Sequence, residues 1–292
     1  MSRRAWAIAS VILLMVLWGT TFVVTKEAVR EVPPLTLGFL RFFIAALVLL
    51  PIAFARGGLA TLPRPLPLAR LVWMGIAGIA VFSISFNYAM SYASASQGAL
   101  IFALVPAAVL IAAMVGLGER PSRRRIVGIV LSICGVAIVV VAGKTGGSAS
   151  HPVLGAFWML VAVVAWAFYT VLAKKLEQAD QIVVIALVSL VSLVLLLPAA
   201  AFEVARFGLP EPSPAGWLGT LFLGLFASAL AYVWYSRALQ QLDASVVGVY
   251  LNLDPIVGVI TAVLFLGETL NGLQIAGGIA AFAGMWLAST RD

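Results

Sequence analysis

Ten long apolar stretches, separated by short polar gaps, constrain this chain more than any other feature of its sequence. A helix needs about twenty mostly apolar residues to cross a hydrocarbon core of roughly 30 Å. An open sheet would leave unpaired backbone groups in lipid, so each span is expected to be a helix. We therefore predict an all-α membrane protein with ten transmembrane helices. The predicted spans are residues 5–25, 34–55, 70–92, 97–117, 126–142, 153–173, 181–202, 215–237, 244–266 and 271–290.

The composition excludes a water-soluble fold. Apolar residues make up 63% of the chain and charged residues 10%, whereas soluble domains have about 45–50% and about 25%. The net charge of +7 could indicate nucleic-acid binding, but lysine and arginine lie in the gaps between apolar stretches, as in membrane-flanking loops. We expect membrane lipid and a small-molecule solute as partners, and no nucleic acid. The single cysteine, Cys134, excludes an intramolecular disulfide.

The first apolar stretch is interpreted as a retained span and not as a signal peptide. It is longer than a signal-peptide core, and no small-residue cleavage site follows it. The positive-inside rule then predicts a multi-pass protein of the cell (inner) membrane with both termini in the cytoplasm. The cytoplasmic set is Arg3, Arg4, Arg56, Arg64, Arg70, Arg120, Arg123, Arg124, Arg125, Lys174, Lys175, Arg237 and Arg291. The opposite set is Lys26, Arg30, Lys144 and Arg206.

The two halves of the sequence repeat each other at a nearly constant offset. Trp18 and Lys26 recur as Trp166 and Lys174, 148 residues later. An offset of 149 relates Pro106 to Pro255, Gly118-Glu119 to Gly267-Glu268, and Gly128 with Gly135 to Gly277 with Gly284. Five spans per copy would make the second copy enter the membrane from the opposite face, as in secondary transporters. We predict two inverted five-helix repeats, residues 1–146 and 147–292.

Several of these residues resemble motifs of the drug/metabolite transporter superfamily, EamA type. They are Trp18-Gly19-Thr20-Thr21-Phe22, Arg41-Phe42, and a proline followed thirteen residues later by glutamate, at Pro106–Glu119 and Pro255–Glu268. The second half departs from the pattern, because Trp166-Ala167-Phe168-Tyr169-Thr170 lacks the glycine and the last phenylalanine, and Ser189 stands where Arg41 would recur. The resemblance implies export of amino acids or other metabolites through a central cavity, with aromatic-amino-acid exporters among the similar proteins.

Asp254 and Arg41 are the candidates for ion or proton coupling. An ionised carboxylate in the middle of a span is costly, so Asp254 is a functional candidate by default. The following Pro255 cannot donate a helix hydrogen bond and would free the carbonyl of Leu251. Arg41 could bind a substrate carboxylate. The competing interpretation gives both residues structural roles, with Asp254 paired to a buried base such as Arg41, or with Arg41 extending toward the membrane interface.

Polar and aromatic residues at helical spacing are the candidates for a substrate cavity. Ser83, Asn87 and Ser91 form one stripe in the third predicted span, and Ser228 precedes a similar set in the eighth. Hydrogen bonding between helices is the alternative role for the polar members, and a place in an interfacial belt is the alternative for the aromatic ones. The candidate cavity residues are Trp18, Ser83, Asn87, Ser91, Trp166, Tyr169, Tyr232, Tyr235, Tyr250 and Asn252.

Other repeated residues are expected to be structural. Glu119 and Glu268 each precede the last helix of a repeat, where an acid favours the helix N-terminus. Small residues at helical spacing predict close helix packing. These stripes are Gly128, Ser132 and Gly135 in one copy, and Gly277, Ala281, Gly284 and Ala288 in the other.

Three functional classes are compared: a membrane enzyme, a secondary transporter and a channel-like uniporter. The sequence lacks the catalytic groups that a membrane enzyme needs, because one histidine and one cysteine supply neither a metal cluster nor a nucleophile–histidine pair. We therefore expect no catalytic residue, metal or cofactor, and the absence of a phosphate-binding loop argues against ATP-driven transport. A secondary transporter of amino acids or amphipathic drugs is the main prediction. A facilitative, channel-like uniporter stays open, as do the direction of transport, its coupling and a monomeric state.

Overall fold

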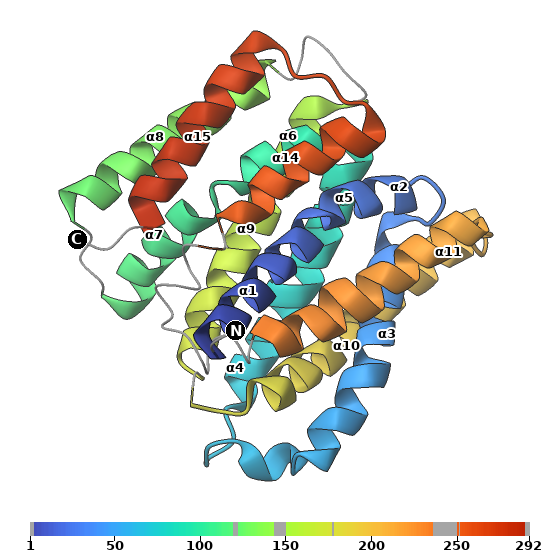
Figure 1. Cartoon of the computed structure of the whole chain (residues 1–292). Coiled ribbons are helices and arrows are strands. Elements are labelled where there is room, and N and C mark those ends of the chain that lie inside the picture. Colours follow the sequence, from blue (N-terminus) through green and yellow to red (C-terminus); the bar gives the residue numbers. More distant parts are fainter. Residues whose placement is uncertain are drawn as a thin grey trace.

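The structure is a computed structural model that describes residues 3–118, 122–142, 150–176, 178–235, 250 and 252–289. Every regular element in these ranges is helical (Figure 1). In the first half, the elements are α1 (Arg3–Gly19), α2 (Thr21–Ala28), α3 (Pro34–Ala55), the short η1 (Gly58–Thr61), α4 (Leu68–Trp73), η2 (Met74–Val81), α5 (Phe82–Tyr92), α6 (Ala95–Phe102), α7 (Val105–Leu117) and α8 (Arg123–Ala142). In the second half they are α9 (Pro152–Lys174), α10 (Gln181–Phe207), α11 (Pro214–Leu221), η4 (Phe222–Leu230), α14 (Leu253–Leu266) and α15 (Gly272–Ser289).

Some of these elements join into longer apolar helices. Within the described ranges, eight helices are long and apolar enough to cross a membrane, and two apolar helices, Leu253–Leu266 and Gly272–Ala288, are shorter. The chain is thus an all-helical, multi-pass membrane protein. The start of the predicted ninth span (244–249), Leu251 and the end of the eighth (236–237) lie outside the described residues. The eight long helices are Ala9–Ala28, Pro34–Ala55, Leu68–Tyr92, Ala95–Gly116, Arg123–Ala142, Pro152–Lys174, Gln181–Phe207 and Pro214–Tyr235.

Proline and glycine set several helix boundaries. Pro106 follows the break between α6 and α7, because its ring nitrogen has no hydrogen to donate to the preceding turn. Gly118 and Gly267 end α7 and α14 with φ of +70° and +63°, a left-handed conformation that glycine adopts without a Cβ penalty. This requirement explains why glycine recurs before each of the repeated glutamates.

Two segments of π-helix were not predicted from the sequence. They are η2 in the third long helix and η4 in the eighth, and they occupy corresponding positions in the two halves. Gly75 of η2 lies against Val191 of α10, and Gly224 of η4 lies against Ile44 of α3. The offset between these glycines is again 149, so each half packs its π-segment against the second long helix of the other half.

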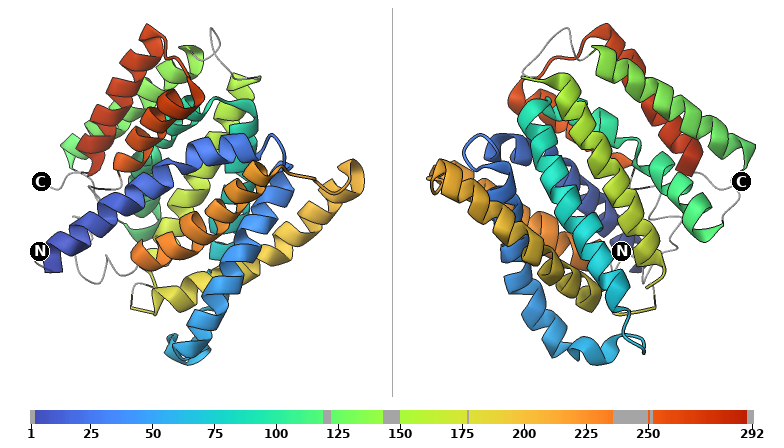
Figure 2. Two further views of the ribbon diagram at one scale, coloured as in Figure 1. Left: turned by 45° about the vertical axis from the view of Figure 1, so that its right-hand side comes forward. Right: turned by 180° about the vertical axis from the view of Figure 1, so that it is seen from behind.

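The helices α8 and α15 lie side by side at one edge of the molecule (Figures 1 and 2). A Cβ added to Gly128 or Gly135 would lie within 3 Å of the α15 backbone, and one added to Gly284 would meet Gly128 O at 2.6 Å. The predicted small-residue stripes therefore pack against each other, which confirms their role in helix contact. Toward the opposite edge, α3 packs along α10.

Candidate functional site

Five aromatic side chains meet at the centre of the helix bundle. Trp18, at the end of α1, has its ring centroid 6.2 Å from that of Trp166 on α9 and 5.8 Å from that of Tyr232. Tyr235 lies 5.7 Å from Trp18, and Tyr169 stacks on Trp166 at 5.3 Å. We call these five residues the aromatic centre. All were sequence candidates for the cavity; their role in binding stays a prediction, whereas their proximity is observed.

Trp18 is fixed in the aromatic centre by a hydrogen bond between the two halves. Its indole N–H donates to the carbonyl oxygen of Ala227 at 3.0 Å, and only 9% of the residue is exposed. Ala227 belongs to η4, and π-helical turns occur frequently at functional sites. A wall of phenylalanines adjoins the centre, because Phe82 lies 5.2 Å from Trp166 and stacks on Phe86.

Arg41 lies next to the aromatic centre and is 6% exposed. Its Nε donates to the hydroxyl of Ser228 at 2.7 Å, and its guanidinium lies 5.5 Å from the ring centroid of Phe42. Tyr232, a member of the aromatic centre, belongs to the same hydrophobic cluster as Phe42. Arg41 on α3 and Trp18 on α1 thus bind neighbouring residues of η4, which brings the cation beside the aromatic rings.

Asp254 lies on the other side of α1. Its carbonyl oxygen is 2.8 Å from the position of a Cβ on Gly19, the residue after Trp18. Its Oδ1 is buried and has no hydrogen-bond partner among the described residues. Within the described ranges the ion pairs are Arg30–Glu27 and Arg56–Asp180, so the alternative in which Arg41 pairs with Asp254 is wrong. The carbonyl of Leu251 lies outside the described residues.

The stripe of Ser83, Asn87 and Ser91 faces α3 for at least part of its length. Asn87 donates to the carbonyl oxygen of Pro34 at 2.8 Å, and Ser83 Oγ is 3.1 Å from the position of a Cβ on Gly38. Ser91 donates to the Asn87 carbonyl within its own helix at 3.0 Å. These contacts are interhelical or local, and a role in the cavity stays a prediction for all three residues.

The last two sequence candidates lie at the start of α14. Asn252 is the N-cap residue of that helix and is 6% exposed. Tyr250 is partly buried and packs against the hydrophobic cluster that contains Trp18. The two residues are therefore close in sequence to Asp254 and belong to the same region of the bundle.

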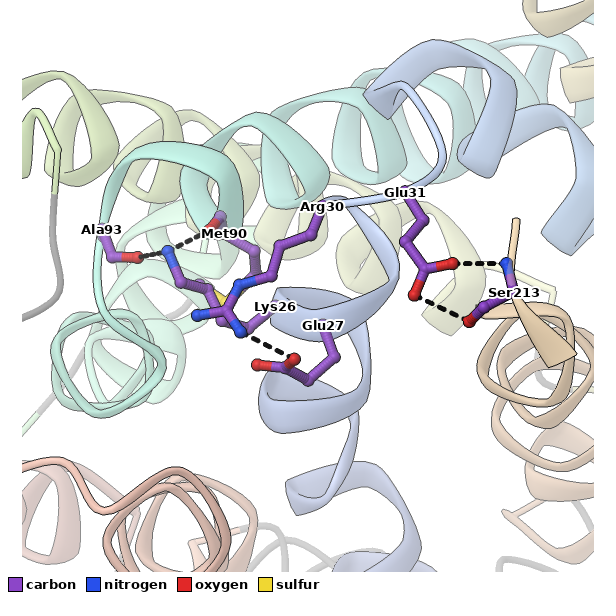
Figure 3. Close-up of polar contacts among 7 residues, drawn as sticks. All are labelled: Lys26, Glu27, Arg30, Glu31, Met90, Ala93 and Ser213. Atoms are coloured by element: carbon purple, nitrogen blue, oxygen red, sulfur yellow. Dashed lines mark hydrogen bonds and ion pairs between the residues drawn. The ribbon is translucent and has the colours of Figure 1, made fainter. Parts of the chain in front are cut away.

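Four charged side chains at one end of the bundle were not recognised as a group from the sequence. Lys26, which follows the first predicted span, is 6% exposed and donates to the carbonyl oxygens of Met90 and Ala93 at 2.8 and 2.6 Å (Figure 3). The ammonium thus provides hydrogen-bond donors to carbonyl oxygens at the C-terminus of α5, which have no partner within the helix. Glu31 accepts from the backbone N–H and hydroxyl of Ser213, before α11, at 2.6 and 3.0 Å (Figure 3).

The other two members of this group are glutamates that cap helices of the opposite half. Glu203 of α10 accepts from Thr36 N and Oγ at 2.7 and 2.8 Å, at the start of α3. Glu268 accepts from the backbone N–H of Ala95 and Ser96, each at 2.8 Å, and from the Ser96 hydroxyl. The predicted structural role of Glu268 at a helix N-terminus is therefore confirmed, but the helix that these bonds cap is α6 and not the helix that follows it. Glu119 lies outside the described residues.

These caps share one feature that sequence reasoning missed. Glu31, Glu203 and Glu268 each bond to the half of the chain to which they do not belong, and all complement the positive end of a helix dipole. We call the end that holds these three residues and Lys26 the glutamate end. At the opposite end, Arg56 pairs with Asp180 at 2.7 Å and Arg70 donates to the carbonyl of Lys175. The only sequence signal for the caps was a glutamate near a span boundary.

Comparisons with known proteins match both halves of the chain to one family. The family model for the EamA-like transporter family matches residues 5–141 and again residues 153–290. The uncharacterized transporter YetK of Bacillus subtilis (strain 168) is 27% identical over 98% of this chain and 87% of its own length. A probable amino-acid metabolite efflux pump of Salmonella typhimurium is 29% identical over 98% and 95% of the two chains. A probable terminal-alkyne amino-acid exporter of Streptantibioticus cattleyicolor is 26% identical over 100% and 95%.

A solved crystal structure has the same fold. It superposes with a TM-score of 0.65 over 98% of this chain and 97% of its own, at 21% sequence identity. The fold, the aromatic centre between the two halves and the double match of the family model lead to one conclusion. The chain belongs to the EamA-like transporter family.

Proposed function

We propose that this protein is a secondary transporter that exports small metabolites, in particular amino acids or amphipathic molecules of similar size. The observation that carries the proposal is the aromatic centre, with Arg41 bonded to Ser228 next to it and the backbone of Asp254 against Gly19, the residue after Trp18. Side chains from both halves form it. An apolar wall with a few fixed polar groups is typical of small-molecule sites. Two relatives are named as exporters of amino acids or their metabolites.

We further propose ten spans, arranged as two inverted repeats of residues 1–146 and 147–292. The family model matches once in each of these ranges. The two π-segments and the contacts of Gly75 and Gly224 recur with the same offset. In the contact of α8 with α15, Gly135 meets Gly277 and Gly128 meets Gly284. Because Gly128 corresponds to Gly277 and Gly135 to Gly284, the repeat relates these two contacts to each other. A two-fold axis in the membrane plane would produce these relations.

In this proposal the glutamate end faces away from the cytoplasm, because the arginine and lysine residues concentrate at the opposite end. The three carboxylate caps hold the halves together at the glutamate end. Access to the centre from that side then requires these caps to break, while access from the other side leaves them intact. This is the expected behaviour of alternating access between two repeats.

The test is transport by the full chain in proteoliposomes. A panel of radiolabelled L-amino acids is measured for saturable uptake and for counterflow, in which excess unlabelled solute on one side drives accumulation of label on the other. A carrier shows both. Flux that does not saturate and shows no counterflow would identify a channel-like uniporter, and no flux of any amino acid would remove the proposed substrate class.

A further inference from the structure

Arg41 places a cation inside the bundle without an acidic partner. It is the eighth residue of α3, so its Cα lies about 10 Å along the helix from Pro34 at 1.5 Å per residue. Among the residues that the structure describes, no carboxylate lies within ion-pair distance of its guanidinium. Its guanidinium contacts the hydroxyl of Ser228 and the Phe42 ring, and Tyr232 follows Ser228 by four residues, about one helical turn. Burying a charge is costly unless it is paired.

The hydrogen-bonding capacity of Arg41 exceeds what its neighbours use. A guanidinium carries five N–H donors, and Ser228 takes the one on Nε. The single bond to the Ser228 hydroxyl does not explain why this position holds a charged side chain, because a neutral hydrogen-bond donor could make the same bond. Arginine is the side chain whose two terminal nitrogens match both oxygens of a carboxylate, with a charge that is always present. The excess capacity therefore indicates an anionic ligand.

The surroundings of Arg41 indicate what else that ligand carries. Tyr232 is 8% exposed, and its hydroxyl makes no hydrogen bond in the described part of the chain. Its ring lies 5.8 Å from Trp18 and 6.4 Å from Trp166. A solute whose carboxylate reaches Arg41 would therefore place its neighbouring atoms against aromatic rings.

We propose that Arg41, oriented by Ser228 and flanked by Tyr232, is the subsite that binds the carboxylate of the transported solute. The inference rests on the proposed transport function and deepens it, because it makes the carboxylate a requirement for recognition. The structural role of Arg41 as a contact between α3 and η4 is the competing explanation. It predicts a loss of stability without any change in preference among solutes.

The test uses four probes that share one phenyl ring and differ in two groups. L-Phenylalanine has a carboxylate and an ammonium, and L-phenylalaninamide has the ammonium only. 3-Phenylpropanoate has the carboxylate only, and 3-phenylpropanamide has neither. Dissociation constants are measured by calorimetry on the purified full chain in lipid nanodiscs. The wild-type protein is expected to bind each acid at least about tenfold more tightly than its amide, as for a hydrogen-bonded charged group.

Arg41→Gln should bring both acid-to-amide ratios close to one and leave the affinities of the two amides unchanged. Arg41→Lys keeps the charge but not the bidentate geometry, so it should retain part of each ratio. Arg64→Gln removes an exposed arginine in the segment after α3 and serves as the matched control with wild-type ratios. Amide binding and a single gel-filtration peak report that the variants are folded.

Two results would overturn the inference while leaving transport intact: wild-type protein that binds acids and amides equally, or Arg41→Gln protein that keeps the preference for acids. A wild-type protein that binds none of the four probes would overturn both the amino-acid substrate class and the subsite. The two proposals therefore fail in distinguishable ways.

Discussion

Trp18 connects the aromatic centre to η4. Its N–H bonds to Ala227 of η4, its ring contacts Trp166, Tyr232 and Tyr235, and the next residue lies against Asp254. Arg41 reaches the same stretch of η4 through Ser228. A shift of η4 relative to α1 would therefore disturb the bonds of both Trp18 and Arg41.

The first prediction concerns Asp254. Its Oδ1 is buried and without a partner among the described residues, which suits a group that gains and loses a proton during transport. Asp254→Asn keeps the size of the side chain and removes the titratable group. We expect the variant to lose transport driven by a pH gradient and to retain counterflow at equal pH on the two sides. Solute flux in proteoliposomes with and without a pH gradient measures both, and unchanged gradient-driven flux in the variant would contradict proton coupling.

Sequence reasoning located the unusual residues of the site but not their partners. Asp254 and Arg41 are conspicuous because charge is rare inside apolar spans. The serine that binds Arg41 lies 187 positions away, and nothing in the local pattern selects it. Lys26 follows the first predicted span in a gap between apolar stretches, whereas the structure buries it against carbonyls of α5. Partner identity depends on tertiary packing, which a single sequence does not encode locally.

At the scale of elements, the close contact of α8 and α15 explains the small residues at their interface. A side chain added at Gly135 would meet Gly277 O at 2.6 Å. Without a hydrophobic force between helices in lipid, such close backbone packing supplies much of the association energy.

The second prediction follows from this contact. Gly135→Ala should lower the free energy of unfolding by about 1–3 kcal/mol, because the new methyl group forces α8 and α15 apart. Gly272→Ala is the matched control, since a Cβ at Gly272 would meet no atom within 4 Å. Thermal unfolding in detergent compares the two variants with the wild type. Equal midpoints for Gly135→Ala and Gly272→Ala would argue against tight packing at this interface.

The third prediction concerns the caps at the glutamate end. The carboxylate of Glu203 satisfies backbone N–H groups at the start of α3, a helix of the other half. Its removal leaves buried donors without an acceptor, so Glu203→Ala should destabilise the fold by about 1–2 kcal/mol. Glu211→Ala removes an exposed glutamate nearby in sequence and should have no effect. The thermal unfolding midpoints of both variants are compared with that of the wild type. A Glu203→Ala midpoint equal to the wild-type midpoint would show that the cap contributes nothing to stability.

Helix positions could be predicted well, because the length of an apolar run is a local property. The π-segments could not be predicted, because the sequences of η2 and η4 have the same apolar composition as an ordinary membrane helix. The assignment of Glu268 to the following helix failed for a related reason. Sequence proximity suggested the nearest N-terminus, but the chain fold brings α6 closer.

At the scale of the whole molecule, the two halves hold each other at both ends and enclose the aromatic centre between them. Glutamate caps connect them at one end, and Arg56–Asp180 connects them at the other. Two of the three caps, those of Glu203 and Glu268, are buried, whereas the Glu31–Ser213 cap and the Arg56–Asp180 contact are exposed. Exposed ion pairs contribute little to stability, so the arginine-rich end should open more easily in this conformation.

The most direct test of alternating access is a pair of distance measurements by pulsed electron paramagnetic resonance. In a Cys134→Ser background, one spin-label pair replaces the exposed residues Arg30 and Glu211 at the glutamate end, and another replaces Arg64 and Gln178 at the arginine-rich end. Each pair spans the two halves. Upon addition of transported solute, we predict that the population with a separated glutamate end rises as the population with a separated arginine-rich end falls. Distances that change in the same direction at both ends, or at neither, would contradict the account.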